Sequence, residues 1–235
     1  MNKFFKNFFI LILLIVFITA FSSSYLSLSV GNLAYVLAIG IDSSNTDKYR
    51  VTFQFSTSTS ISETGTSKKT PTISKSVEAG SLSSAINLMN SYMGKELNLS
   101  HCKIIVFSEE IAYKGISDEI YTLINDTQVR PSANIIVSQC NAKYYIENTK
   151  PDLEKLISKY YEIFTNSSSY TGFMPKAKIG DFFNNLVCKG CMPYAITGNI
   201  TSNQTENIGL AAFDGDKFVR KIKFYWNNCL FMYQK

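Results

Sequence analysis

The chain has 235 residues, of which 46% are hydrophobic and 17% are charged, with a formal net charge of +5. It can therefore fill the core of one large domain or two small ones. The basic residues are scattered along the chain, whereas a protein that binds nucleic acid needs a clustered basic face. The composition thus predicts no nucleic-acid partner and favours a weak attraction to an anionic membrane surface.

The first segment, residues 1–24, has the features of an export signal. Lys3 and Lys6 precede an apolar run from Phe8 to Phe21, and Ser22 begins a patch of small residues. The run has 14 residues, whereas a membrane-spanning helix needs roughly 20. The segment is typical of a signal peptide, with an uncleaved N-terminal membrane anchor as the alternative. In either case we expect the rest of the chain on the extracytoplasmic side of a membrane.

Three strands and a helix are predicted next. Residues 33–41 are almost wholly apolar, which indicates a central strand buried on both faces. Residues 49–56 alternate apolar and polar side chains and follow the polar turn 42–48, so we expect a half-buried strand in a hairpin with the first. A third strand covers 73–78, and Ser81 caps a helix with an apolar stripe.

Strands and helices then alternate. Apolar strands are predicted at 103–107 and 133–138, and helices at 117–125 and 141–147. The order β-β-β-α-β-α-β-α, with crossovers after the hairpin, predicts an α+β fold with a mixed β-sheet packed by helices. We assign it to an N-terminal domain at residues 25–147.

A linker at 148–152 is followed by a smaller α+β second domain at residues 153–235. It begins with an amphipathic helix from Leu153 to Phe164, where an exposed apolar patch would mark a partner contact. A shorter helix at 179–186, a strand at 194–200 and a hairpin with Asp214-Gly215 at its turn follow.

Few residues suggest chemistry. Cys188 and Cys191 have the spacing of redox and zinc sites, but no second pair of ligands accompanies them, so a structural role is the alternative. Cys102 and Cys140 lie in apolar segments and are expected as buried thiols. The single histidine, His101, precedes a strand, where a residue at the strand edge is the simpler interpretation.

The carboxylates Asp42 and Asp47 lack the spacing of a calcium loop and fit a hairpin turn. The sequence also lacks a Gly-rich phosphate loop and a zinc-protease motif. We therefore predict no catalytic residue, no cofactor-binding residue and no metal ligand, and hence a protein that is not an enzyme.

Four segments in matching order resemble the Ger(x)C spore-germination proteins. They are "NLAYVLAIGID" at 32–42, "HCKIIVFSEEIAYKGISDEI" at 101–120, "QVRPSANIIVS" at 128–138 and "NIGLAAFDGDKFV" at 207–219. The resemblance implies a C subunit of a nutrient germinant receptor. It would lie on the outer face of the spore inner membrane beside membrane-embedded A- and B-type subunits. Whether this chain binds a small-molecule germinant directly is left open.

The chain departs from the family pattern in two places. Family members carry a lipobox, Leu-x-Gly-Cys, whose cysteine receives a lipid, whereas no cysteine occurs here before Cys102, so no lipidation is expected near Ser22. Family members also continue into a long C-terminal domain beyond the hairpin at 207–219. By that comparison the chain is shortened and its second domain incomplete, as a functional short form or as a truncated product.

Three classes of function follow. The first is the non-enzymatic receptor subunit that the resemblance implies, which docks on membrane-embedded partners and contributes to nutrient-triggered germination. The second is an unrelated extracytoplasmic binding or adhesion module. The third is a thiol oxidoreductase that uses Cys188 and Cys191.

Overall fold

The computed structural model describes residues 3–22, 33–56, 72–149, 154, 157–166, 176–201 and 204–222. Two compact units are present, one from Met1 to Asn32 and one from Leu33 to Lys235. Helix α1, Lys3–Ser22, is the one element described in the first unit. Within the described ranges, no helix is both long and apolar enough to cross a membrane.

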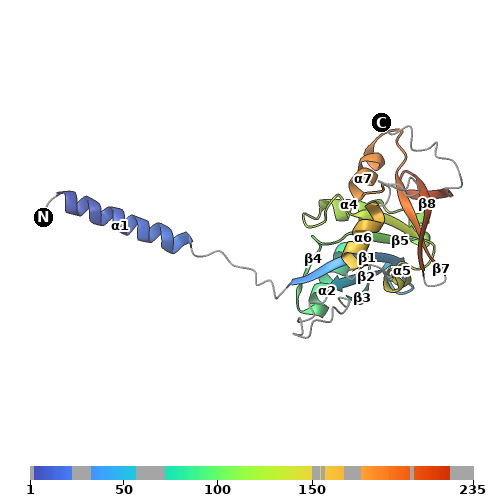
Figure 1. Ribbon diagram of the computed structural model, residues 1–235, viewed down its shortest axis with the longest axis horizontal. Helices are drawn as coiled ribbons and strands as arrows, with labels where there is room; N and C mark the ends of the chain where they lie inside the picture. Colours follow the sequence, from blue (N-terminus) through green and yellow to red (C-terminus); the bar gives the residue numbers. More distant parts are fainter. Residues whose placement is uncertain are drawn as a thin grey trace. The chain divides into compact units, whose positions relative to one another are not determined.

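One mixed β-sheet organises the second unit (Figure 1). Its strands lie in the order β3-β2-β1-β5-β6-β7-β8-β9, with β4 paired to β1. The neighbours β1, β5, β6 and β7 run parallel, and the pairs at both ends of the sheet are antiparallel. The strands are β1 Leu33–Ser43, β2 Tyr49–Ser56, β3 Thr72–Ala79, β4 Glu96–Asn98, β5 Ile104–Ser108, β6 Asn134–Ser138, β7 Tyr194–Thr201, β8 Gln204–Asp214 and β9 Lys217–Ile222.

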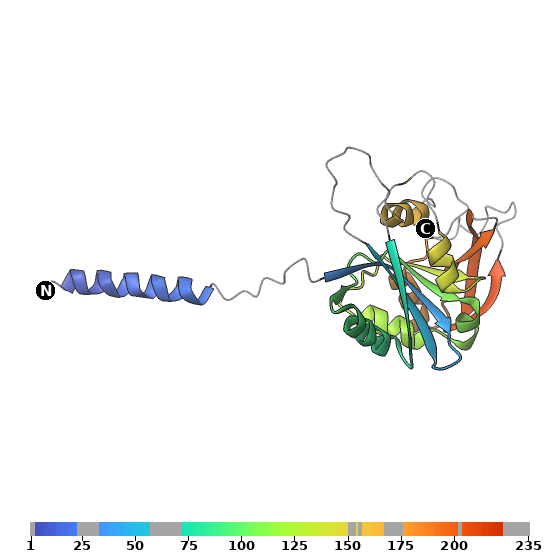
Figure 2. The ribbon, with the colours of Figure 1, turned by 90° about the horizontal axis from the view of Figure 1, so that it is seen from below.

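Helices cover both faces of this sheet. They are α2 Leu82–Met93, α3 Glu109–Lys114, α4 Ser117–Asn125, α5 Ala142–Asn148, α6 Ile157–Asn166 and α7 Ile179–Val187. Buried side chains of α2, α3, α4 and α7 join one apolar cluster, and those of α5 and α6 join another. Figure 2 shows α2 and α4 on one side of the sheet and α6 on the other. Because both faces are covered, the parallel strands carry continuous apolar runs.

The expected α+β fold with a mixed sheet is confirmed, as is the β1–β2 hairpin. Ser81 caps α2 as predicted, with its hydroxyl accepting the backbone N–H of Ser84. Two short elements were not predicted, strand β4 and helix α3. Three and six residues are too few to show a periodicity.

The expectation that β2 is half-buried is wrong. Its polar residues Thr52 and Gln54 are buried like its apolar ones, because α5 and α6 lie over the face that was expected to meet solvent. The Gln54 amide is satisfied there: its Nε2 donates to the Ile146 carbonyl at 3.3 Å, and its Oε1 accepts from the Tyr161 hydroxyl at 3.1 Å. A strand whose sequence alternates apolar and polar residues can therefore be buried on both faces when each polar side chain has a hydrogen-bond partner.

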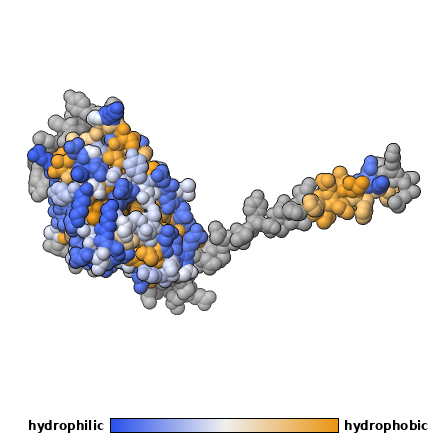
Figure 3. All heavy atoms as spheres, turned by 180° about the vertical axis from the view of Figure 1, so that it is seen from behind, coloured by the Kyte–Doolittle hydropathy of each residue, from blue (hydrophilic) through white to orange (hydrophobic). Residues whose placement is uncertain are grey.

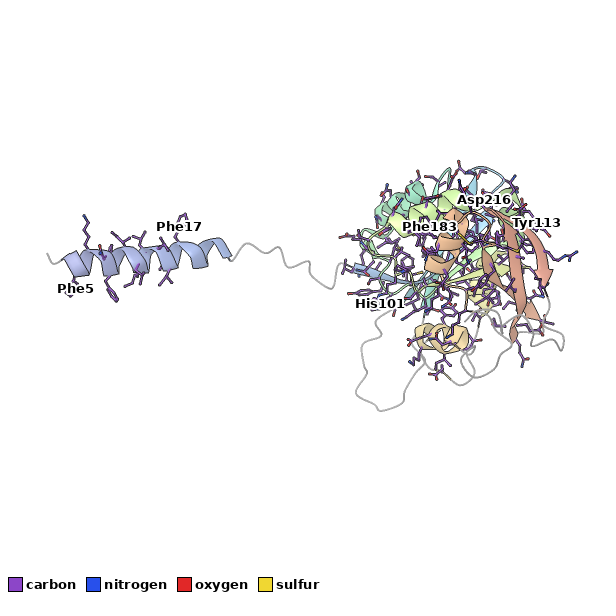
Figure 4. All side chains as sticks on the ribbon, turned by 90° about the horizontal axis from the view of Figure 1, so that it is seen from above. Phe5, Phe17, His101, Tyr113, Phe183 and Asp216 are labelled. Carbon is purple, nitrogen blue, oxygen red and sulfur yellow. A yellow bond between two sulfur atoms is a disulfide. The ribbon has the colours of Figure 1, made fainter. Side chains whose placement is uncertain are left out.

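The sequence was expected to divide into two domains at the linker 148–152, whereas the structure shows one sheet that continues across it. Strand β7 pairs directly with β6, so β7, β8 and β9 extend the sheet of the expected N-terminal domain. The turn between β8 and β9 packs on the loop between α3 and α4, where Ile116 N–H donates to the Asp216 carbonyl at 3.1 Å. Tyr113 and Asp216 lie close together there (Figure 4), and the ring centroids of Tyr113 and Phe218 are 4.8 Å apart. The sequence reveals a polar linker between these segments, but it does not reveal that β6 and β7 pair with each other.

The hairpin of β8 and β9 forms as predicted, and β9 lies at one end of the sheet order. Among the described strands, β9 therefore forms one edge of the sheet. The aromatic segment that follows, residues 223–235, lies outside the described residues.

The packing of this hairpin makes Gly115 a sensitive position. Its φ is +114°, and an added Cβ would lie 2.5 Å from Asp216 Oδ2. We expect Gly115→Ala to lower the free energy of unfolding by about 2 kcal/mol, because the residue must adopt a strained backbone and the Asp216 side chain must move. Urea unfolding of the purified chain measures this.

Gly94→Ala is the matched control, since Gly94 also has a positive φ but no atom within 4 Å of an added Cβ. It should cost about 1 kcal/mol. Asp216→Ala should restore part of the loss in the Gly115→Ala background and none in the Gly94→Ala background. Equal losses for the two glycine variants would contradict the packing argument.

Candidate functional site

Small and polar residues lie in a row where the parallel strands end. Ser108 of β5 pairs with Ser138 of β6, which pairs with Gly198 of β7. Asp42 comes one residue beyond the paired Ile41 of β1, as Ser108 comes one beyond its partner Phe107. Asp42 and the two serines are all buried. In sheets of parallel strands, ligand sites form at this carboxyl edge.

Asp42 connects this row to helix α5. Its Oδ1 accepts the backbone N–H of Ala142 at 2.6 Å, and its Oδ2 accepts that of Lys143 at 2.9 Å. Gly40, two residues earlier on the same face of β1, lets the helix approach, because an added Cβ would lie 2.8 Å from Ile146 Cδ1. A carboxylate at a helix N-terminus is favourable since it satisfies N–H groups that have no partner within the helix.

The environment of Asp42 shifts its proton affinity. Burial raises the pKa of its carboxyl, and this effect outweighs the lowering by the N–H groups of Lys143 and Ala142, by Arg50 and by Ser108. Sequence analysis placed Asp42 in a polar turn. That assignment is wrong, because β1 continues to Ser43 and the carboxylate faces α5. The segment "AIGID" thus contains both Gly40, which lets α5 approach the strand, and Asp42, which accepts the N–H groups of its first turn.

A polar pocket of about 270 Å³ opens beside this row, and we name it the carboxyl-edge pocket. Its lining residues are Asp42, Ser43, Asn45, Arg50, Ser108, Glu109, Glu110, Gln139, Cys140 and Asn141. A neighbouring pocket of about 360 Å³ shares Ser43 and extends toward Lys114, Asp118 and Asp216. Within the described part of the chain, no group of three His, Cys, Asp or Glu side chains could hold a metal ion.

Of the histidine and cysteines considered from sequence, all within the described ranges, only Cys140 lines this pocket. The His101 ring packs edge-on against Tyr35, with 5.1 Å between centroids. Cys102 is buried as predicted, its thiol donates to the Ile104 carbonyl, and burial raises its pKa to about 12. Cys140 lines the pocket and is only partly buried, with its sulfur 3.2 Å from Ser138 Oγ.

Cys188 and Cys191 form a disulfide at the C-terminus of α7, with 5.4 Å between their Cα atoms. A reactive thiolate in a Cys-x-x-Cys motif is stabilised at a helix N-terminus, whereas the negative end of the helix dipole lies at the C-terminus. The position therefore favours a structural role.

Apolar side chains of α4, α7 and the residues that flank this disulfide remain exposed or partly exposed, and we name this group the α4–α7 patch. Phe183 lies on α7 (Figure 4), and its ring meets that of Tyr121 on α4 edge-on, with 5.3 Å between the centroids. Val187 and Met192 flank the disulfide and are 53% and 63% exposed. Most of the apolar side chains of the expected patch on α6, namely those of Leu153, Leu156, Ile157 and Phe164, lie outside the described part of the structure. Of the described ones, Tyr161 is buried and Ile163 is exposed.

The Asp42 contact can be tested by two substitutions. We expect Asp42→Ala to lower the free energy of unfolding by about 1–3 kcal/mol, since two buried N–H groups lose their acceptors. Asp42→Asn keeps one acceptor and should lose less. Chemical unfolding at neutral pH compares both variants with the parent chain.

The raised pKa predicts the sign of the pH dependence. A carboxyl that binds its proton more tightly in the folded state adds to the free energy of unfolding. This added stability is fully present below the unfolded-state pKa of 3.8, and it is lost as the pH rises through the folded-state pKa. The stability of the parent relative to Asp42→Asn should therefore decrease over that range. An increase would contradict the assignment of burial as the dominant cause.

The disulfide gives a further prediction. Changing both Cys188 and Cys191 to Ser should cost at most about 2 kcal/mol, because the closed loop is short. The purified parent should not reduce insulin disulfides in the presence of dithiothreitol faster than this variant does. A faster rate for the parent would instead support the oxidoreductase.

Comparison with known proteins places the fold in a family. A family model described as the spore germination protein N-terminal domain matches residues 29–196, and no curated protein matched. A solved structure titled "Crystal Structure of the GerBC protein" is 17% identical, with a TM-score of 0.38 over 79% of this chain and 51% of GerBC. This chain thus spans about half the length of GerBC.

The family match covers well over half of the chain and runs from before β1 into β7, across the expected linker. The chain therefore belongs to the family of Ger(x)C spore germination proteins, as its sequence resemblance indicated.

Proposed function

We propose that this chain is a non-enzymatic subunit of a spore germinant receptor. It would act at the extracytoplasmic face of a membrane, beside membrane-embedded A- and B-type subunits, and contribute to nutrient-triggered germination. The observation that carries the proposal is the family match over residues 29–196. The match makes an unrelated adhesion module the weaker alternative.

The N-terminal helix supports association with a membrane. Every apolar side chain of α1 from Phe8 to Phe17 is at least 43% exposed. Figure 3 shows this part of the surface as almost continuously hydrophobic. Exposed apolar surface gains roughly 25 cal/mol per Å² when it leaves water, so partition into a lipid phase is favourable. We propose that this helix, rather than a lipid on a residue near Ser22, provides the attachment.

The α4–α7 patch supports docking on a protein partner. Large apolar side chains that stay exposed together commonly mark an interaction surface. The disulfide joins Cys188 and Cys191, the sequence neighbours of Val187 and Met192, and therefore restricts the backbone between those two exposed residues. Lys189, between the two cysteines, adds a positive charge beside it.

A thiol oxidoreductase is the weaker candidate. Its one supporting observation is the exposed Cys188–Cys191 disulfide. The position at the C-terminus of α7 disfavours a thiolate at Cys188.

The docking proposal predicts the outcome of a co-purification from spore membranes. The parent chain should be recovered together with multi-span receptor subunits. A variant with both Val187→Asp and Met192→Asp should recover at least tenfold less of them, because two charges would be buried in an apolar contact.

Val219→Asp on β9 is the matched control, since Val219 is 57% exposed and belongs to another element. It should leave recovery unchanged while both variants accumulate to the parent level. Normal recovery with the doubly charged variant would exclude the patch. Failure of the parent to recover any multi-span subunit would contradict the receptor assignment itself.

A further inference from the structure

We propose that the edge at which the parallel strands β1, β5 and β6 begin contacts the anionic headgroups of the lipid surface. The contact would use a group of basic side chains that we name the basic amino edge: Lys95, Lys103, Arg130, Lys176 and Lys178. The inference rests on the membrane attachment by α1 that is proposed above, and it adds which surface of the second unit meets the lipid. It stands on backbone placement, on the distribution of charge and on the length of the connection to α1.

Hydrogen bonds between strands bring Lys103 and Lys178 to the same edge. Lys103 N–H donates to the Leu37 carbonyl, and Asn134 N–H donates to the Lys103 carbonyl, both at 2.9 Å. Lys178 forms an antiparallel bridge with Asn134, at the start of β6. Lys176, two residues earlier, is exposed. The starts of β5 and β6 therefore lie beside β1, each with a basic residue next to it.

Arg130 and Lys95 extend this edge. Arg130 belongs to the turn that leads into β6, where its carbonyl accepts the N–H of Ala133 at 2.9 Å. Lys95 comes directly before β4, which pairs in parallel with the first residues of β1. Figure 4 shows His101 beside the start of β1, where its ring packs against Tyr35. Basic residues that are far apart in the sequence thus share one end of the sheet.

The positive charge of this edge is only partly neutralised. Lys103 pairs with Glu162 at 3.6 Å. Glu96 follows Lys95 in the chain, and the Asp126 carboxylate accepts the backbone N–H two residues further on. In the part of the chain that the structure describes, no ion pair engages the other three cations of the edge, Arg130, Lys176 and Lys178.

The two pockets have the reverse charge. Cations line them too, but Lys48, Arg50 and Lys114 each pair with an acid. The acids among the lining residues are Asp42, Asp47, Glu109, Glu110, Asp118, Glu119 and Asp216. An anionic surface would therefore attract the basic amino edge and repel the pockets, which gives the second unit a preferred orientation.

The chain itself favours lipid as the occupant. Helix α1 ends at Ser22, and β1 begins at Leu33. The ten residues 23–32 that connect them span about 35 Å at most. With α1 in the lipid, the start of β1 is held within that reach of the headgroups. Tyr92, in the last turn of α2 and 72% exposed, adds an amphipathic ring of the kind that is enriched at membrane interfaces.

The test uses the full chain on vesicles of phosphatidylcholine alone or of an equal mixture with phosphatidylglycerol. Lysines are acetylated with a water-soluble reagent, and mass spectrometry of peptides gives the rate at each one. Lys95, Lys176 and Lys178 should react at least about threefold more slowly on the mixed vesicles. Lys143 and Lys217 should react equally on both. Salt at 1 M should remove the difference, because it shortens the Debye length to about 3 Å.

A triple variant makes the test specific. Each basic residue near an anionic surface strengthens binding about fivefold, so Arg130→Gln with Lys176→Gln and Lys178→Gln should weaken the contact about 100-fold. Lys95 should then react equally on both kinds of vesicle. The matched control is Lys143→Gln with Lys217→Gln and Arg220→Gln, which removes the same charge from α5 and β9. It should keep the protection of Lys95.

The outcomes separate this contact from the attachment by α1. A chain that floats with both kinds of vesicle but shows equal lysine rates would overturn the contact alone, and would leave the basic amino edge to an acidic protein. Protection of Lys143 and Lys217 to the same extent, or of Lys95 in the triple variant, would also overturn it. A chain that floats with neither kind would contradict both the contact and the attachment.

Discussion

The contact between the Asp42 carboxylate and the first turn of α5 is the interaction on which the rest of the fold depends. It joins residues 100 positions apart, and it is made where β1, an interior strand of the sheet, ends. Gly40 allows the helix to lie against the strand, and the acid then satisfies two of its N–H groups. With α5 in place the second face of the sheet is covered, and Gln54 is buried with both ends of its amide bonded. The same carboxylate lines the carboxyl-edge pocket.

A second consequence is that the two halves of the sequence form one structural unit. Strand β7 continues the parallel row after β6, and the hairpin of β8 and β9 packs back on the loop between α3 and α4. A disturbance at the hairpin is therefore expected to reach Gly115 and Ile116, which lie near the larger pocket. The α4–α7 patch lies on the face of the sheet opposite α5 and α6. A partner bound there would leave the helices over the other face free.

The sequence predicted most of the elements and the family but not the way in which they combine. Long apolar runs and caps such as Ser81 reveal strands and helices because their signals are local. The pairing of β6 with β7 depends on residues about 60 positions apart, and a polar linker between them favoured two domains instead. The contact of Asp42 with α5 was not predicted for a similar reason. An acidic residue at the end of a strand is typical of a turn, and the helix that it contacts is distant in the sequence. Its signal was the neighbouring Gly40, since a glycine inside an apolar strand often marks a close contact.

The central claim is that this protein serves germination as a receptor subunit rather than as a catalyst. The most direct measurement is the loss of optical density of spores after nutrients are added, in a strain without this chain and in the same strain with the chain restored. The account predicts that removal slows or abolishes the response to at least one nutrient, that restoration recovers it, and that a chain with Ser at both 188 and 191 recovers it equally. Spores that respond normally to every nutrient without the chain would contradict the account, as would recovery that requires both cysteines.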